Sequence, residues 1–312
     1  MAEVLLDLIA QNWTGPVGAV KRGLKPGEAP DAAWTRSMPI AETIDKNRLS
    51  HNFGRQAARY DQYAVVQRRL ARELVHTLQA SGERYTRILE IGCGTGYLTS
   101  LLRQAFPQAH LTALDLAPAA IQTAQTRLAG VSGIEWLVAD GEQEPPARYD
   151  LITSSSVFQW FGQPARACHR YYRALLPGGM LAFATLGPRT FGELAASFAR
   201  AGELLPEIPV PIIPAQNFAN RRDWQEYLQL AGFRGIAWRE EIWQEIYPDL
   251  WAFLRAVRGM GATSTRPVFL SRRLLALMAD HYQHSFSRAG GIQVSYEVMW
   301  LHGNKPLVKE SW

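Results

Sequence analysis

The sequence predicts an α/β protein built on a doubly wound, mostly parallel sheet with helices on both faces. Two observations favour this class. From residue 85 onward, short apolar segments alternate with helix-like segments, as in sheets whose parallel strands are joined by helical crossovers. The chain also has 312 residues, 47% hydrophobic and 20% charged, which is enough for one large domain with added segments and too apolar for a disordered chain.

Residues 1–44 are expected to be an N-terminal extension that ends at the start of a helix. A short apolar segment leads there into a stretch rich in glycine and proline, which is typical of a linker. The next segment, 45–80, predicts a helix because apolar residues recur at every fourth position, at Val66, Leu70, Leu74 and Leu78. The Ser-Gly pair that follows would end it.

The central part of the chain predicts five strands joined by helices. The strands are expected at 87–92, 110–116, 134–140, 149–156 and 180–187, and the helices at 97–106, 118–130 and 164–176. Pro118 suits the first turn of its helix, and Pro177-Gly178-Gly179 would stop the last one.

Beyond residue 187 the alternation becomes less regular. Apolar segments at 236–247 and 292–301 predict two more strands, which complete a seven-stranded sheet. Segments at 188–231 and 249–290 are mostly helix-like, and we expect them to form a helical insertion that caps the sheet after its fifth strand. Sheet and cap together would make one domain of residues 45–312.

Composition excludes several classes of protein. Two cysteines, Cys93 and Cys168, are too few for a disulfide framework, and the spacing of cysteine and histidine lacks a zinc pattern, so no metal is expected. His281 and His284 could share a helix face, but such pairs are usually surface residues. The N-terminus lacks the features of a signal peptide and no apolar run is long enough to span a membrane, so we expect a cytoplasmic protein without membrane contact.

The basic residues point to an acidic partner or substrate. The net charge is +5, and 28 of the 33 basic residues are arginine, whose planar fork binds carboxylates and phosphates. No arginine cluster is interleaved with aromatic residues in the manner of a nucleic-acid surface, so no nucleic acid is expected.

A glycine-rich string, Glu90-Ile91-Gly92-Cys93-Gly94-Thr95-Gly96, follows the first predicted strand. In open α/β sheets, ligands bind beyond the carboxyl ends of the strands, and glycines there let a ligand approach the backbone. Asp115 ends the second strand, where it could accept hydrogen bonds from ribose hydroxyls. Asp140 ends the third, where it could accept one from an adenine amino group, and Ser155 ends the fourth near the same crevice. The spacing G-x-G-x-G differs from the dinucleotide fingerprint G-x-G-x-x-G, which disfavours a nicotinamide-dependent oxidoreductase.

The loop and the two acids together resemble the S-adenosylmethionine-dependent methyltransferases of Rossmann-like fold. The resemblance implies that Gly92, Gly94 and Gly96 shape the loop under the methionine and ribose, and that Glu90 organises it. It also implies contacts with the cofactor from Cys93, Asp115, Leu116, Asp140, Gly141 and Ser155. The Cys93 thiol is expected to be a small buried filler without reactivity.

Five segments narrow the resemblance to the malonyl-acyl-carrier-protein O-methyltransferases of biotin synthesis. They lie at 53–71, 155–164, 185–198, 250–263 and 296–306, so the similarity covers about residues 45–306. The implied reaction moves a methyl group to the free carboxylate of a malonyl thioester, carried by acyl carrier protein or coenzyme A. A carboxylate is ionised at pH 7, so no general base is required.

The same resemblance implies roles for residues outside the loop. Tyr60 and Gln67 would form a lid over the cofactor, with Tyr60 near the sulfonium, although both could simply pack their helix. Gln159 and Trp160 would face the transferred methyl group, or Trp160 could be a core aromatic residue. Three arginines are candidates to bind the substrate carboxylate: Arg189, Arg255 and Arg258. Two adjacent pairs could dock an acidic carrier protein: Arg221 with Arg222, and Arg272 with Arg273.

Two alternatives stay open. A carboxyl methyltransferase for another small acid, such as trans-aconitate, would use the same fold and loop. A non-catalytic protein that only binds S-adenosylmethionine would do so as well.

Overall fold

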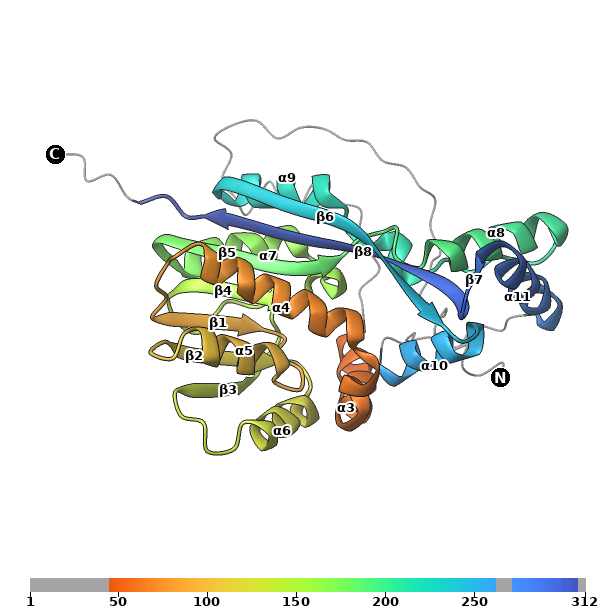
Figure 1. The fold of residues 1–312 in the computed structure, drawn as a ribbon. Helices are drawn as coiled ribbons and strands as arrows, with labels where there is room; N and C mark the ends of the chain where they lie inside the picture. Colours follow the sequence, from red (N-terminus) through yellow and green to blue (C-terminus); the bar gives the residue numbers. More distant parts are fainter. Residues whose placement is uncertain (1–44, 262–270, 308–312) are drawn as a thin grey trace.

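The computed structural model describes residues 45–261 and 271–307, so the predicted extension, apart from its boundary, lies outside the described residues. A single sheet runs through the molecule in the order β3-β2-β1-β4-β5-β8-β6, with the short β7 paired to β8 (Figure 1). Its strands are β1 Arg87–Ile91, β2 His110–Asp115, β3 Ile134–Val138, β4 Tyr149–Ser155, β5 Leu175–Leu186, β6 Arg234–Tyr247, β7 Ser287–Arg288 and β8 Gly291–Asn304. The predicted α/β sheet is confirmed, and β7 is an additional two-residue strand.

Strand β1 lies at the point where the strand order reverses. From β1 the chain builds outward through β2 and β3, and then returns to place β4 and β5 on the other side. The pairing is parallel throughout this part, and Ile91 at the end of β1 is opposite Leu114 on one side and Ser154 on the other. The carboxyl ends of three strands therefore meet at one edge, which is where open α/β sheets bind ligands.

Helices cover both faces of the sheet because alternate residues of each buried strand point to opposite sides. On β5, Ala182 and Ala184 join the apolar cluster that contains α4 (Val65–Ala80) and α5 (Tyr97–Ala105). Leu181 and Phe183 of the same strand join the cluster that contains α7 (Pro164–Ala174) and α9 (Arg221–Ala231). The remaining helix of the sheet, α6 (Pro118–Arg127), packs on β2 and β3.

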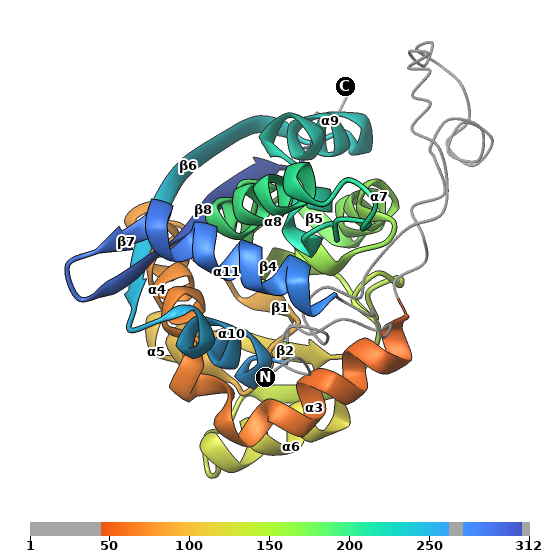
Figure 2. The same cartoon turned by 90° about the vertical axis from the view of Figure 1, so that its right-hand side faces the viewer.

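The hairpin of β6 and β8 projects beyond the rest of the sheet. β8 pairs with β5 only from Val298 onward, whereas its first half pairs with β6 and, at Gly291 and Ile292, with the short β7. Three helices gather at this projecting end, and one of them, α10, lies next to α3 (Lys46–Tyr63), as Figure 2 shows. They are α8 Gly192–Leu204, α10 Leu250–Gly259 and α11 Arg272–Phe286.

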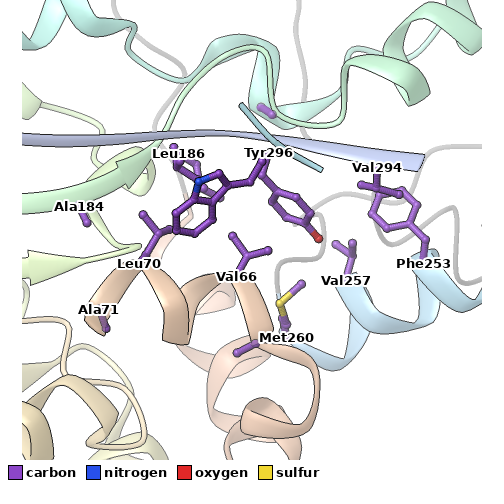
Figure 3. Close-up of a cluster of buried hydrophobic side chains, with 14 of the residues drawn as sticks. Val66, Leu70, Ala71, Ala184, Leu186, Phe253, Val257, Met260, Val294 and Tyr296 are labelled. Atoms are coloured by element: carbon purple, nitrogen blue, oxygen red, sulfur yellow. The ribbon is translucent and has the colours of Figure 1, made fainter. Parts of the chain in front are cut away.

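The cap and the sheet share one apolar core. Figure 3 shows side chains of α4, α10, β5 and β8 in contact, among them Val66, Leu70, Val257, Met260 and Tyr296. Each of these residues is almost fully buried. A shared core of this kind holds the cap against the strand ends where the glycine loop lies.

Two predicted boundaries were wrong. The helix expected over 45–80 is broken at Ala64, whose backbone (φ −81°, ψ 47°) is not helical, and this break separates α3 from α4. The helix expected to end at Pro177-Gly178-Gly179 ends at Ala174, and β5 begins at Leu175. Gly178 donates a backbone hydrogen bond to Lys305 (2.9 Å), so pairing with a residue far along the chain keeps this segment extended.

Candidate active site

A large cavity lies at the carboxyl ends of the central strands, under α3. We call it the loop cavity, because the glycine loop forms its floor; its empty volume is about 1170 Å³, part of it open to solvent. Most of the residues predicted to bind the cofactor line it: Tyr60, Gln67, Gly92, Cys93, Gly94, Asp115, Leu116, Asp140, Gly141 and Ser155. The two others lie just behind it, Glu90 beneath the loop and Gly96 at the start of α5.

The loop needs glycine for two different reasons. Gly92 and Gly94 both have a positive φ, +69° and +53°, which side chains other than hydrogen rarely allow. A Cβ atom at Gly92 would lie 2.3 Å from Cγ2 of Val157, so packing also excludes a larger residue there. A Cβ atom at Gly94 would meet no atom within 4 Å. The loop therefore presents bare backbone to the cavity at Gly94.

Asp115 ties this loop to the end of β2. Its carboxylate accepts hydrogen bonds from the backbone N–H groups of Gly94 and Ala117, both at 2.8 Å. Burial raises the pKa of Asp115, and the hydrogen bonds from these two amides partly oppose the shift. The predicted contact with ribose hydroxyls stays a prediction, and the carboxylate lies where that contact requires it.

Asp140 forms an ion-pair cluster that the sequence did not predict. The ammonium of Lys46, in the first turn of α3, lies 2.7 Å from Asp140 Oδ2 and 2.5 Å from Glu142 Oε2. Burial lowers the pKa of Lys46, but its hydrogen bonds to the two carboxylates outweigh that effect, so its pKa is raised. Burial alone would raise the pKa of Asp140, but the hydrogen bond from Lys46 outweighs this effect, so its pKa is lowered.

The other end of α3 is tied to the glycine loop. Asp61 accepts a hydrogen bond from the hydroxyl of Thr95 (2.9 Å) and pairs with Arg127 of α6. Together with Lys46, this contact holds α3 across the cavity at both ends. No motif in the sequence marks these residues; the only signal is that a helix with polar residues at both ends precedes the loop.

Glu90 lies in an unusual environment for an acidic residue. Its side chain is almost fully buried, and neither of its oxygens has a hydrogen-bond partner among the described residues. Burial raises the pKa of Glu90 to about 8, with the nearby Asp115 adding to the shift and Thr99 opposing it. The carboxyl group is therefore largely protonated near pH 7, and its predicted role in organising the loop would be that of a neutral group.

A second cavity adjoins the first, with an empty volume of about 600 Å³. We call it the cap cavity, because residues of the cap form its far wall, namely Thr190, Phe191, Pro214, Ala215, Phe218, Val257 and Met260. Phe53, Tyr60, Gln67, Ser156 and Trp160 line both cavities and form a shared wall. Tyr60 and Gln67 thus lie in the wall between the cavities, and their role as a lid over the cofactor stays a prediction.

Gln159 and Trp160 lie in a short 3₁₀ turn, η1 (Phe158–Trp160), after β4. The Gln159 amide donates to the carbonyl of Ser156 (3.0 Å) and accepts from the hydroxyl of Thr185 (2.9 Å). Gln159 lines the cap cavity but not the loop cavity. The ring of Trp160 packs edge-on against Phe53 and Phe218 at 6.0 and 5.5 Å. Trp160 therefore belongs to the shared wall rather than to the core.

The structure places none of the three candidate substrate arginines at the cavities. Arg189 is bound by two carboxylates, with its Nε 2.9 Å from Glu297 and its terminal nitrogen paired to Glu240. Arg255 and Arg258 lie on the exposed face of α10, whereas Val257 lines the cap cavity. Among the described residues, the cap cavity has no arginine or lysine in its lining.

The other predicted features have structural surroundings of their own. Arg221 pairs with Glu240 (3.4 Å) and covers the Trp238 ring, whereas Arg222, Arg272 and Arg273 are exposed. Burial raises the pKa of the Cys93 thiol well above its usual value. Within the described residues, no three metal-ligating side chains lie close together, and no helix is long and apolar enough to cross a membrane.

The chemistry of the loop cavity fits an adenosyl sulfonium donor. Gly94 exposes backbone to it, Asp115 is the last residue of β2, and Asp140 lies just beyond the end of β3 at Val138. The Gln67 carbonyl, the Ser155 hydroxyl and Nε of Arg68 line it or border it and lack hydrogen-bond partners among the described residues, so polar groups are available for a ligand. This fold and this site define an S-adenosylmethionine-dependent methyltransferase.

Comparison with known proteins agrees with a methyltransferase and indicates one family of this class. Residues 89–181 match the profile of a family described as a methyltransferase domain. A malonyl-[acyl-carrier protein] O-methyltransferase of Brevibacillus brevis is 35% identical over 272 residues, 83% of this chain and 96% of the relative. The corresponding protein of Geobacter sulfurreducens is 35% identical over 268 residues, 84% of this chain and 100% of the relative. The chain belongs to the family of malonyl-[acyl-carrier protein] O-methyltransferases.

Solved structures support the fold. The crystal structure of the YcgJ protein from Bacillus subtilis superposes with a TM-score of 0.53 at 14% sequence identity. It covers 75% of this chain and 99% of that protein. At this level of identity the likeness concerns the fold alone.

Proposed function

We propose that this protein transfers the methyl group of S-adenosylmethionine to the free carboxylate of a malonyl thioester carried by acyl carrier protein. The observation that carries the proposal is the pair of adjoining cavities with a shared wall of Tyr60, Gln67 and Trp160. One cavity has the glycine loop and the acids that suit the donor, and the other is suited to an acceptor. The family to which the chain belongs supports malonyl-acyl carrier protein as that acceptor, with malonyl-coenzyme A as the alternative.

The reaction requires little chemistry from the protein. S-adenosylmethionine supplies a methyl group on a positively charged sulfur, and the malonyl carboxylate is a nucleophile without loss of a proton. Tyr60 is the only ionisable group among the described residues that line the cap cavity. Burial and the charge of Asp115 raise its pKa, so it remains a neutral hydroxyl and does not act as a base.

The remaining task of the protein is to align the reactants and to exclude water. In-line transfer requires the attacking oxygen about 3 Å from the methyl carbon, in a site closed to solvent. We assign the closure to Trp160 of the shared wall, whose ring packs against Phe53 of the same wall and against Phe218 of the cap. Gln159, whose amide is held by Ser156 and Thr185, is proposed to orient the acceptor, and Tyr60 to face the methyl group.

The cap is proposed to recognise the acceptor. Its segments 188–231 and 249–290 contribute most of the far wall of the cap cavity. Since no described arginine or lysine lines that cavity, we assign the malonyl carboxylate to neutral donors of the shared wall, with the Ser156 hydroxyl as the first candidate. Arg255 and Arg258 lie on the outer face of α10, and Arg272 and Arg273 are exposed at the start of α11; we propose that they meet the acidic carrier protein.

Methyl transfer from labelled S-adenosylmethionine tests the proposal directly. The protein would be incubated with malonyl-acyl carrier protein, malonyl-coenzyme A, acetyl-acyl carrier protein and trans-aconitate, and the methyl esters would be quantified. We expect esters of the malonyl thioesters and none of the acetyl thioester, which lacks a free carboxylate. Methylation of trans-aconitate alone would assign the protein to another carboxyl methyltransferase, and donor binding without any ester would make it a binding protein.

A further inference from the structure

Arg68 presents a guanidinium group to the loop cavity. It lies in the first turn of α4, is partly buried, and lines the loop cavity without lining the cap cavity. Its guanidinium carbon lies 6.0 Å from the centre of the Tyr97 ring, and Tyr97 is the first residue of α5 after the glycine loop. Arg68 is therefore at the glycine-loop end of the cavity. Lys46, the other basic residue in the described part of the lining, is paired with Asp140.

The charge of Arg68 is not balanced by the protein. Among the described residues no carboxylate forms an ion pair with it, and its Nε is buried without a hydrogen-bond partner. Other arginines near the cavities are paired, as Arg127 is with Asp61 and Arg189 with Glu297. A cationic donor that is buried and unpaired is unfavourable, so its retention at a cavity wall points to an anionic ligand group.

We propose that Arg68 binds the carboxylate of the methionine moiety of the donor. The inference rests only on the donor half of the proposed function. The malonyl carboxylate is not the occupant, because Arg68 does not line the cap cavity. Methyl transfer between the cavities requires the sulfur of the donor to lie near their shared wall. Gln67 is part of that wall, and Arg68 is the next residue along α4. The planar fork of arginine can bind the methionine carboxylate through two parallel hydrogen bonds.

Calorimetric binding of two ligands tests this assignment without any turnover. The ligands are S-adenosylhomocysteine and its decarboxylated analogue, which keeps the ammonium and the thioether and lacks only the carboxylate. We expect the wild-type protein to bind the analogue roughly 10- to 100-fold more weakly, because a charge-assisted hydrogen bond is lost. The R68Q variant should bind both ligands with equal affinity, close to that of the wild type for the analogue.

The neighbouring R69Q variant is the matched control. Arg69 is exposed, covers the Trp243 ring at 3.8 Å and does not line the loop cavity, so R69Q should discriminate between the ligands as the wild type does. Binding of the analogue by R68Q also shows that the variant is folded. The assignment is overturned if R68Q still prefers S-adenosylhomocysteine as strongly as the wild type does, or if R68Q weakens both ligands equally. Neither result would touch the malonyl half of the proposed function.

Discussion

Glu90 combines deep burial with a position directly under the glycine loop, and its protonation should affect stability. Its pKa of about 8 in the folded protein is above the usual 4.5, so the folded state holds a proton that the unfolded state releases between these values. The free energy of unfolding should therefore fall as pH rises from about 5 to about 8. The E90Q variant is permanently neutral and should lose less stability over this range, by about 1 kcal/mol or more.

Urea denaturation at pH 5.5 and pH 8 measures this difference. The quantity to compare is the change in the free energy of unfolding between the two pH values, in the wild type and in E90Q. Because other groups titrate in both proteins, only the difference between the two changes is informative. Equal changes in both proteins would show that Glu90 is ionised in the folded state.

Two alanine substitutions separate the two reasons for glycine in the loop. G92A would place its Cβ atom 2.3 Å from Val157 at a φ of +69°, and we expect a loss of about 2–4 kcal/mol of stability. G94A has strain from its φ of +53° but no steric contact, so we expect a loss of only about 1–2 kcal/mol.

Although G94A should lose little stability, it should lose much of its affinity for the donor. Its methyl group would point into open space in the lining of the loop cavity, so S-adenosylhomocysteine should bind more than tenfold more weakly although the protein is folded. Thermal melting and calorimetry provide the two measurements. A G94A variant that binds the ligand normally would mean that the loop does not approach it.

At the scale of elements, α3, which we propose as the lid of the loop cavity, is held by contacts at both ends. The ammonium of Lys46 joins the first turn of α3 to Asp140 and Glu142, and we expect K46A to loosen this end. The pair is partly exposed, so its contribution is about 1 kcal/mol, and the dissociation rate of S-adenosylhomocysteine should rise severalfold. Stopped-flow fluorescence measures that rate.

Salt dependence and a matched variant complete this experiment. In the wild type, added salt should screen the Lys46 cluster and speed dissociation, and K46A should be less sensitive to salt. Arg48 lies on the same helix, and within residues 45–261 and 271–307 it pairs with Asp45 alone, at 3.6 Å, so R48A should release the ligand at the wild-type rate. If R48A and K46A had the same effect, a general weakening of α3 would explain the result.

The elements of the sheet were predictable because their signals are local. Strands β1, β2 and β4 are apolar runs that end in glycine, aspartate or serine, and their observed bounds lie within one residue of the predicted ones. The break at Ala64 had no such signal, since alanine favours helices; its side chain is fully buried in an apolar cluster that exists only in the folded protein. The early start of β5 depends on Lys305, which is close only after folding.

The residues of the site also divide into those with a local sequence signal and those whose position depends on the folded chain. Gly92, Gly94, Asp115 and Asp140 follow from strand ends, and a sequence pattern is enough to bring them together. Lys46 and Asp61 reach the cavity only because the chain turns at Ala64 and lays α3 across the loop, and Arg68 reaches it from the start of α4 just after that turn. The sequence could not place the candidate arginines relative to the cavities, because the ion pairs of Arg189 and the exposure of Arg255 and Arg258 depend on the cap, which carries little periodic signal.

At the scale of the whole molecule, the cap meets the lid through a close contact between α10 and α3. Gly259 packs so near to Tyr63 that a Cβ atom there would lie 2.4 Å from its ring. A Cβ atom at Gly261 would lie 2.9 Å from the carbonyl oxygen of Asn52 and 3.0 Å from Cα of Phe53. Phe53 and Tyr60 of α3 line both cavities, and Val257 of α10 lines the cap cavity. Displacing α10 from α3 should therefore alter the acceptor site more than the donor site.

The G259A variant tests this coupling. We expect a loss of about 1–3 kcal/mol of stability from overpacking, together with a higher KM for the malonyl thioester and little change in the affinity for S-adenosylhomocysteine. The same substitution at Gly192, the first residue of α8, would meet no atom within 4 Å and should leave all three quantities unchanged. A G259A variant that loses donor and acceptor binding to the same extent would show that the cap and the lid act as a single rigid wall, and that the two cavities cannot be tuned separately.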